Sequence, residues 1–258
     1  MLTDVAYCNA DPAQKMDLHF PGSGGPWPAV VYVHGGGWMH GDKMEAGMFA
    51  GGLNSIGFLV VSLNYRLHPP ATFPAMIDDV KCAIRFLRAH GAKYNLDPNR
   101  IAAMGASAGG HLVSLLGTTD SGAWEAGDYL EQSSRVQAVI SLAGVMDLSQ
   151  DFPNPEGNDI ETMNRIGFSE ANIRLASPIS HVTPESPPFL LIHGDQDELV
   201  PYQQSQLMYE RLMQMNIPAR LVIVKNASHA FLDTNGSMSP SLAELNTILL
   251  EFLTKYLG

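Results

Sequence analysis

The stretch that decides the fold begins at Ile101 and reads IAAMGASAGGHLVSLL. Its first part, Ile101–Met104, is apolar and typical of a buried strand, whereas His111–Leu116 has the composition of a helix. The residues between them, Gly105-Ala106-Ser107-Ala108-Gly109-Gly110, are small enough for a sharp turn of the backbone. The stretch therefore predicts a strand, a tight turn and a helix, with the Ser107 hydroxyl raised at the turn.

A serine at such a turn is a candidate nucleophile, because the turn exposes its hydroxyl and directs nearby backbone N–H groups at a bound substrate. The pattern Gly-x-Ser-x-Gly also occurs by chance, and a glycine-rich turn that only starts a helix is the alternative. The rest of the chain has to decide between these two interpretations.

Short β-branched runs alternate with longer amphipathic stretches, which is typical of helices that cross between the parallel strands of one sheet. After Pro74, apolar residues recur at helical spacing from Ile77 to Leu87, and Ser241–Leu257 predicts a closing helix. We therefore expect an α/β fold with a mostly parallel sheet of about eight strands and helices on both faces. The expected strands are Val5–Tyr7 and Met16–Phe20 as an opening hairpin, then Ala29–His34, Phe58–Leu63, Ile101–Gly105, Val136–Ala143, Phe189–His193 and Arg220–Val224.

The length of 258 residues suits one domain, residues 1–258, around a single wide sheet. Residues from about 145 to 188 are irregular and rich in Pro, Asn, Asp and Glu. They fall between two core strands, where a plain connection would be far shorter. We interpret this segment as a lid or cap insertion.

The amino-acid composition limits the kinds of molecule that the protein is expected to bind. The net charge of −11, from 15 basic and 26 acidic residues, disfavours nucleic acid and other anionic polymers. The sequence shows neither a leader pattern nor a membrane span, so we expect a cytoplasmic protein, with a homo-oligomer left open. Cys8 and Cys82 fit no metal spacing; Cys82 is expected to be a buried free thiol, and a disulfide is not needed.

A second glycine-rich motif, His34-Gly35-Gly36-Gly37-Trp38, ends a predicted strand upstream of Ser107. Glycines can present bare amides to a substrate oxygen, and the amides of Gly36, Gly37 and Ala108 are the candidate donors of an oxyanion hole. Such a donor stabilises a developing oxyanion by roughly 3–4 kcal/mol. A flexible surface loop is the alternative interpretation.

A nucleophilic serine needs a base, and His229 is the candidate because its loop directly follows the last predicted strand. By contrast, His34, His111 and His193 are expected to have structural roles. The base needs a carboxylate partner, for which Asp197 is chosen over the neighbouring Asp195 and Glu198, with Asp147 as a fallback. The chain order serine, aspartate, histidine is the one typical of α/β-hydrolases.

Taken together, these motifs resemble the hormone-sensitive-lipase-like esterases of the α/β-hydrolase fold, in particular their bacterial acetyl- and feruloyl-esterase-like relatives. The resemblance rests on His34–Trp38, Asn64–Leu67, Asp97–Ile101, Gly105–Gly110, Asp197–Pro201 and Ser228–Phe231. It implies a serine carboxylesterase that cleaves short-chain acyl esters, including acetylated or feruloylated sugar esters, through an acyl-enzyme.

The resemblance also implies Asp197 as the acid and supports Gly36 and Gly37 as oxyanion donors. Little sequence precedes His34, so the large N-terminal helical cap of many members is expected to be missing or minimal. Trp38, with Trp124, is then a candidate for the lining of the substrate pocket. A small-molecule ester is the expected partner, and no metal or organic cofactor is required.

Two other functions remain open at this stage. An arylformamidase or other amidase of the same fold would share the glycine-rich loop and the three catalytic side chains. A non-catalytic homologue that binds small molecules is the alternative outside enzymes. A purely structural module would leave the coincidence of all four motifs unexplained.

Overall fold

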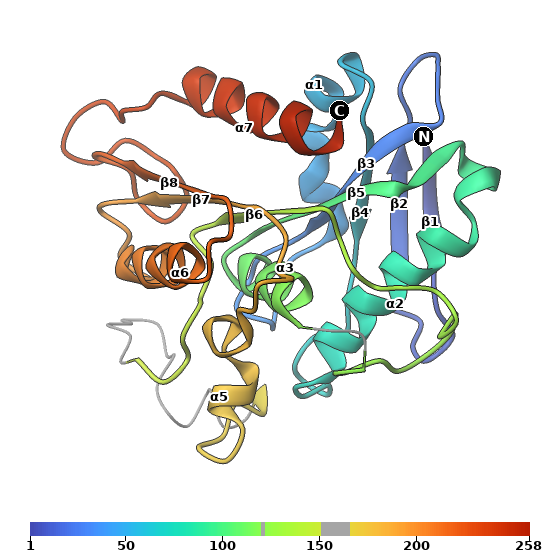
Figure 1. The fold of residues 1–258 in the computed structure, drawn as a ribbon, viewed down its shortest axis with the longest axis horizontal. Helices are drawn as coiled ribbons and strands as arrows, with labels where there is room; N and C mark the ends of the chain where they lie inside the picture. The colour runs from blue at the N-terminus through green and yellow to red at the C-terminus, as the bar shows by residue number, and fades with distance from the viewer. Residues whose placement is uncertain (120–121, 151–165) are drawn as a thin grey trace.

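The computed structural model describes residues 1–119, 122–150 and 166–258. Its centre is an eight-stranded sheet with the strand order β1-β2-β4-β3-β5-β6-β7-β8. Helices cover both faces of this sheet, which gives three layers (Figure 1). The strands are β1 (Leu2–Ala6), β2 (Lys15–His19), β3 (Trp27–Val33), β4 (Leu59–Leu63), β5 (Leu96–Ala106), β6 (Ala138–Leu142), β7 (Phe189–Gly194) and β8 (Ala219–Val224).

The sheet is parallel from β4 to β8, and the two N-terminal strands join it in the antiparallel sense. All five residues of β4 are buried, as are the last six of β3. Strands covered on both faces need such continuous apolar sequence. The expectation of an α/β fold with a mostly parallel sheet of about eight strands is confirmed.

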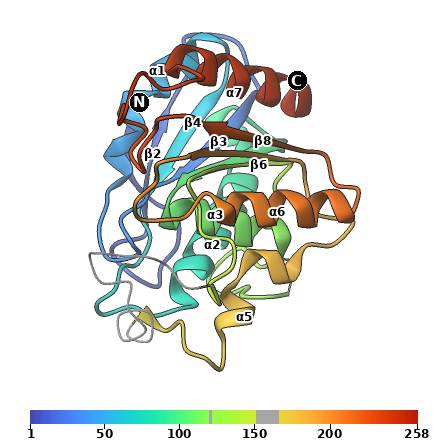
Figure 2. The ribbon, with the colours of Figure 1, turned by 90° about the vertical axis from the view of Figure 1, so that its left-hand side faces the viewer.

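The sheet separates the apolar core into two clusters, one on each face, and each cluster is covered by helices. The first includes Leu112 and Met208 on the face of α2, α3 and α6, and the second includes Leu53 and Leu253 on the face of α1 and α7 (Figures 1 and 2). The predicted helices after Pro74 and Ser241 are both present as α2 and α7. The α-helices are α1 (Ala50–Ser55), α2 (Ala75–Ala89), α3 (Ala108–Thr118), α5 (Ile173–Ala176), α6 (Gln203–Gln214) and α7 (Leu242–Leu257), and the 3-10 helices are η1 (Lys43–Met48), η2 (Gly91–Tyr94) and η3 (Pro178–His181).

The carboxyl ends of the parallel strands meet at one edge of the sheet. Backbone hydrogen bonds continue past the strand ends, from Ser107 N to Leu142 O at 2.8 Å and from Asp195 N to Val224 O at 2.9 Å. The loops after β5, β7 and β8 carry the predicted nucleophile, acid and base. The fold therefore brings these three loops to the same edge.

Part of the expected insertion at residues 145–188 lies outside the described residues, namely 151–165. The described part packs on the body of the protein rather than standing away from it. Phe73 N donates to Ile166 O at 2.8 Å, Ile179 N donates to Met146 O at 3.1 Å, and Phe168 is buried. In Figure 1 the described part of the insertion, with α5, lies beyond α3 and α6, on the face of the sheet that these two helices cover.

The two cysteines form a disulfide, Cys8–Cys82, so the expectation of a free thiol at Cys82 is wrong. The bond joins the segment after β1 to the middle of α2, and 74 residues separate its ends. A pair so far apart along the chain gives no sequence signal of its proximity, because only the packing of α2 on the sheet brings the sulfur atoms together.

This disulfide is expected to raise the free energy of unfolding by about 2–4 kcal/mol, because it restricts a long loop in the unfolded chain. Denaturant unfolding with and without a thiol reductant measures the effect. The matched control is the double variant Cys8→Ser and Cys82→Ser, whose stability should not respond to the reductant. Equal stability of the wild type in both conditions would contradict the prediction.

Candidate active site

The turn at Ser107 has the strained geometry that its glycine-rich neighbours predict. Ser107 has φ 54° and ψ −118°, a conformation that costs energy for a residue with a side chain. A Cβ atom at Gly109 would lie inside van der Waals contact of the Val33 and His34 carbonyls, because the first turn of α3 crosses the end of β3 closely. The turn therefore requires glycine at position 109 and holds the serine between strand and helix.

The predicted oxyanion loop, residues 34–38, lies directly against this turn. A Cβ atom at Gly35 would be 3.0 Å from Ala106 O and 3.3 Å from Ser107 Cβ. Gly36 adopts φ 100°, and its carbonyl accepts hydrogen bonds from the N–H groups of Met39 and His40 at 3.0 and 2.9 Å. This carbonyl is therefore engaged in the turn that follows the loop.

The amides that were predicted to bind an oxyanion have no competing acceptor. In the part of the chain that the structure describes, neither Gly36 N–H nor Gly37 N–H donates a hydrogen bond. Ala108 is the first residue of α3, where no preceding turn of helix supplies an acceptor for the N–H group. All three donors are thus available beside Ser107.

The predicted acid and base are in direct contact. His229 Nδ1 lies 2.7 Å from Asp197 Oδ2, and the carboxylate is fully buried whereas 15% of the His229 side chain is exposed. The other carboxylate oxygen, Oδ1, accepts the N–H groups of Leu199 and Val200 at 2.9 and 2.8 Å. Contact through Nδ1 leaves Nε2 of His229 as the atom that can exchange a proton with substrate or serine.

Burial alone would raise the pKa of Asp197, but hydrogen bonds from His193 and His229, and from the Val200 amide, lower this pKa well below its usual value. The carboxylate is therefore charged at neutral pH. A charged partner fixes the tautomer of His229 and stabilises the imidazolium that forms when the histidine takes a proton.

The other acidic candidates have different partners. Asp195 Oδ1 accepts Asn226 N at 2.7 Å, and Glu198 Oε2 accepts the backbone N–H of His229 at 3.3 Å rather than its imidazole. The fallback acid, Asp147, accepts from the hydroxyl of Ser149 at 2.6 Å. Among the described residues, Asp197 is the carboxylate that contacts the imidazole of His229.

The structure does not join all three side chains. Among the described residues, Ser107 and His229 share no hydrogen bond, although their loops lie at the same edge of the sheet. Hydrogen bonds of this kind are often long without a bound substrate and tighten when one binds. The structure therefore holds Asp197 and His229 in contact, and the turn of Ser107 lies at the same edge of the sheet.

Trp38 is nearly enclosed, with 2% of its surface exposed. Its indole Nε1 donates to His111 Nδ1 at 3.3 Å, and its ring packs edge-on against Phe168 from the insertion, with centroids 4.8 Å apart. Burial lowers the pKa of His111 to about 4, which keeps this histidine neutral, and its Nε2 donates to Ala176 O at 2.7 Å. These contacts tie the oxyanion loop to both α3 and the insertion.

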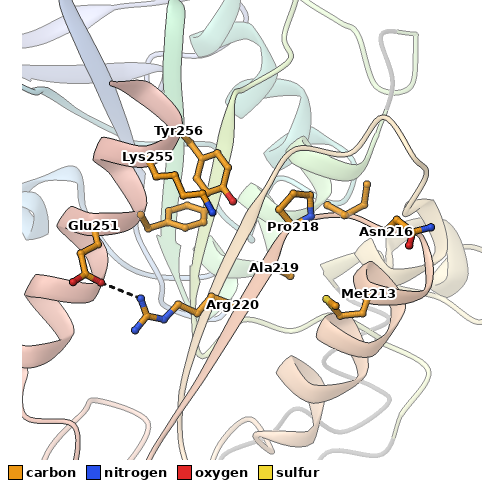
Figure 3. Close-up of a pocket in the computed structure, with 10 residues that line it drawn as sticks. Met213, Asn216, Pro218, Ala219, Arg220, Glu251, Lys255 and Tyr256 are labelled. Carbon is orange, nitrogen blue, oxygen red and sulfur yellow. Dashed lines mark hydrogen bonds and ion pairs between the residues drawn. The ribbon is translucent and has the colours of Figure 1, made fainter.

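A cavity of about 520 Å³ lies away from these residues (Figure 3). It opens near the first residues of β8, at the opposite end of that strand from the loop of His229. The residues around it come from α6, β8, α7 and the connection before β8, and none of them is a predicted site residue. They are Met213, Asn216, Ile217, Pro218, Ala219, Arg220, Glu251, Phe252, Lys255 and Tyr256.

Neither a metal cluster nor a membrane helix is found in the described residues. Within residues 1–119, 122–150 and 166–258, no three His, Cys, Asp or Glu side chains are grouped so that they could hold a metal ion. No helix in these ranges combines the length and the apolar character needed to cross a bilayer.

With this geometry established, comparison with known proteins identifies the family. A family model described as BD-FAE matches residues 16–212, which include Ser107 and Asp197. This chain belongs to the BD-FAE family. The match ends before His229, so the candidate base of this BD-FAE chain is supported by its contact with Asp197 and not by the family model.

Similar proteins are named as esterases. The probable carboxylic ester hydrolase LipM of Mycobacterium tuberculosis is 34% identical over 212 residues, which cover 79% of this chain and 48% of LipM. The solved structure titled a truncated form of carbohydrate esterase from gut microbiota is 30% identical, with a TM-score of 0.86, and the alignment covers 99% of this chain and 95% of that one. The butyrate-bound thermophilic esterase Est2 of Thermogutta terrifontis is 26% identical, with a TM-score of 0.80, over 97% of this chain and 92% of Est2.

These likenesses confirm the expectation of an α/β-hydrolase of an esterase family. The BD-FAE chain spans about half the length of the curated relatives it matches.

Two contacts of the site were not predicted from the sequence. His193 was assigned a structural role, yet its Nε2 lies 3.0 Å from the same Asp197 oxygen that binds His229. The separation of four residues across a turn was the available signal, because residues on either side of a tight turn after a strand approach one another. The contact of Phe168 with Trp38 gave no such signal, since the insertion has no regular pattern.

Proposed function

We propose that this BD-FAE protein is a serine carboxylesterase with Ser107 as nucleophile, His229 as base and Asp197 as acid. The observation that carries the proposal is the buried Asp197–His229 contact of 2.7 Å at the same sheet edge as the strained turn of Ser107. The unoccupied amides of Gly36 and Gly37 beside that turn support it. Each part serves a different step of acyl transfer.

In the proposed reaction, His229 Nε2 takes the proton of the Ser107 hydroxyl as the oxygen attacks the ester carbonyl. The amides of Gly36, Gly37 and Ala108 stabilise the negative charge on the carbonyl oxygen. His229 then gives its proton to the departing alcohol, which leaves an acyl group on Ser107. A water molecule, deprotonated by His229, attacks this acyl group and releases the carboxylic acid, and Ser107 regains its proton.

We further propose that the substrates are small esters with short acyl groups, including acetylated or feruloylated sugars. Two similar proteins support this proposal: one is titled a carbohydrate esterase, which favours a sugar as the alcohol part of the ester, and Est2 was solved with butyrate, which favours a short acyl group. Trp38 stays a proposed pocket residue. Because it is almost completely buried, it can offer a substrate only a small area of contact. No metal or organic cofactor enters the proposed reaction.

The remaining expectations about the whole protein are also proposals. Residues 1–258 are proposed to form one domain with a lid or cap insertion at about 145–188, of which 151–165 lie outside the described residues. Assembly of the chain into a homo-oligomer is left as an open alternative. The cytoplasmic location stays a prediction, and the Cys8–Cys82 disulfide counts against it, because disulfides persist mainly in oxidising compartments.

The experiment that tests the function compares matched substrates and then labels the nucleophile. We expect hydrolysis of the aryl ester 4-nitrophenyl acetate and of an acetylated xylose. Hydrolysis of 4-nitroacetanilide, the amide that corresponds to this aryl ester, should be much slower. A fluorophosphonate should add one phosphonyl group to Ser107, detected by peptide mass spectrometry. Faster cleavage of the amide would favour the amidase, and binding of these compounds without turnover would favour the non-catalytic homologue.

A further inference from the structure

The acid of the proposed triad belongs to a longer chain of buried hydrogen bonds. His193, in β7, is fully buried between the Asp197 carboxylate and Ser205 of α6. Its Nε2 lies 3.0 Å from Asp197 Oδ2 and 2.9 Å from Val200 O, and its Nδ1 lies 2.8 Å from Ser205 Oγ. The path from Ser205 through His193 and Asp197 to His229 is continuous.

The partners of His193 fix where its proton lies. Both neighbours of Nε2 are oxygen atoms that only accept hydrogen bonds, so Nε2 must carry the hydrogen. The neutral imidazole then accepts at Nδ1, and the Ser205 hydroxyl is the donor. Ser205 is fully buried, so water does not compete for this contact.

The backbone amides that bind Asp197 leave its carboxylate free to rotate, and His193 contacts the oxygen that this rotation moves. The amides of Leu199 and Val200 hold Oδ1, but two bonds to a single oxygen do not set the plane of the carboxylate. The position of Oδ2 decides whether a lone pair points at His229 Nδ1. The N–H of His193 contacts this Oδ2 atom, so it selects the rotation in which the contact with His229 forms.

We propose that His193 is a positioning residue, which orients the Asp197 carboxylate toward His229, and that Ser205 holds the His193 ring in place through its hydrogen bond to Nδ1. The inference rests on the proposed function, because it assigns His193 a task only if Asp197 and His229 act in catalysis. The competing role is purely structural, in which His193 supports the turn through the Val200 carbonyl alone.

A matched pair of amide variants tests the proposal. In His193→Gln the side-chain amide reaches the place of the imidazole Nε2 and can donate to Asp197, whereas in His193→Asn the same amide is one methylene too short. We expect His193→Asn to lower kcat on 4-nitrophenyl acetate by about 10- to 100-fold, as for loss of a hydrogen bond to a charged group, with KM little changed. His193→Gln should restore most of the wild-type kcat.

The pH profile separates positioning from a structural role. If Asp197 no longer faces His229, the imidazolium loses its charged partner, and the acidic limb of kcat/KM should move to lower pH. The charged groups near the pair are Asp195, which binds Asn226 N, and Glu198, which binds His229 N. Both are unchanged in the two variants and so cannot produce a difference between them.

Ser205→Ala provides a second route if the His193 variants do not fold. It keeps the His193 side chain but removes the hydrogen bond at Nδ1 that holds the ring in place, so we expect kcat to fall several-fold and the acidic limb to move in the same direction. Melting temperature and circular dichroism show whether each variant is folded.

The outcomes distinguish this inference from the function on which it rests. An inactive wild type, or full activity of Ser107→Ala, overturns the proposed function. An active wild type in which His193→Asn and His193→Gln have equal kcat, or in which the acidic limb stays in place or moves to higher pH, overturns the positioning role alone.

Discussion

Ser107→Ala is expected to lower kcat for 4-nitrophenyl acetate by about a millionfold, because no other group replaces the attacking oxygen. Rate enhancement over water should persist at a low level, since the amides of Gly36 and Gly37 still stabilise the carbonyl oxygen. The fold should be kept, because alanine and serine meet the same strain at φ 54°. Steady-state kinetics and a thermal melt measure both parts of the prediction.

The matched control for this variant is Ser114→Ala in α3, the helix that follows Ser107. The Ser114 hydroxyl donates to Gly110 O within α3 at 2.7 Å and is fully buried. Its loss should change stability slightly and leave kcat close to the wild-type value. A folded Ser107→Ala protein with wild-type activity would remove Ser107 from the mechanism.

The second large effect is expected for Asp197→Asn, which should lower kcat by about 10⁴-fold. The new amide has one acceptor and one donor, yet the carboxylate it replaces accepts hydrogen bonds at both oxygens. If the NH₂ group faces His193 and His229, it meets two N–H donors; if it faces Leu199 and Val200, it meets two others. The charge that stabilises the imidazolium is lost in either orientation.

Two isosteric controls accompany this variant, Asp195→Asn and Asp147→Asn, at the acids that do not contact the His229 imidazole. Kinetics at neutral pH should give near-wild-type kcat for both. A loss of activity in Asp147→Asn that exceeds the loss in Asp197→Asn would identify Asp147 as the acid. Equal stability of the three proteins in urea would show that the kinetic difference is not a folding defect.

Most of the fold could be predicted from periodicity, because the central strands are mostly apolar runs. Strand ends were less certain: β5 begins at Leu96, before the apolar run from Ile101, because residues of mixed polarity extend its pairing with β3 at Leu96. The contact of Asp197 with His229 was predictable because loops after parallel strands share one edge of the sheet. The turn at Ser107 was predictable because few sequences tolerate its backbone conformation.

What could not be predicted depends on packing between distant segments. The disulfide of Cys8 forms only because α2 packs on the sheet beside the segment that follows the N-terminal strand, and sequence spacing carries no record of this. The role of His193 depends on which atom of Asp197 it contacts, at 3.0 Å. The exposure of Trp38 depends on Phe168, which lies in a segment without regular periodicity.

The packing of Phe168 on Trp38 has a consequence for protein engineering. Enlarging the site by rebuilding residues 145–188 would disturb the ring that supports the loop carrying the oxyanion donors. Substrate range and turnover number are therefore coupled design variables in this protein, and a library that varies the insertion should keep Phe168, Trp38 and His111 fixed.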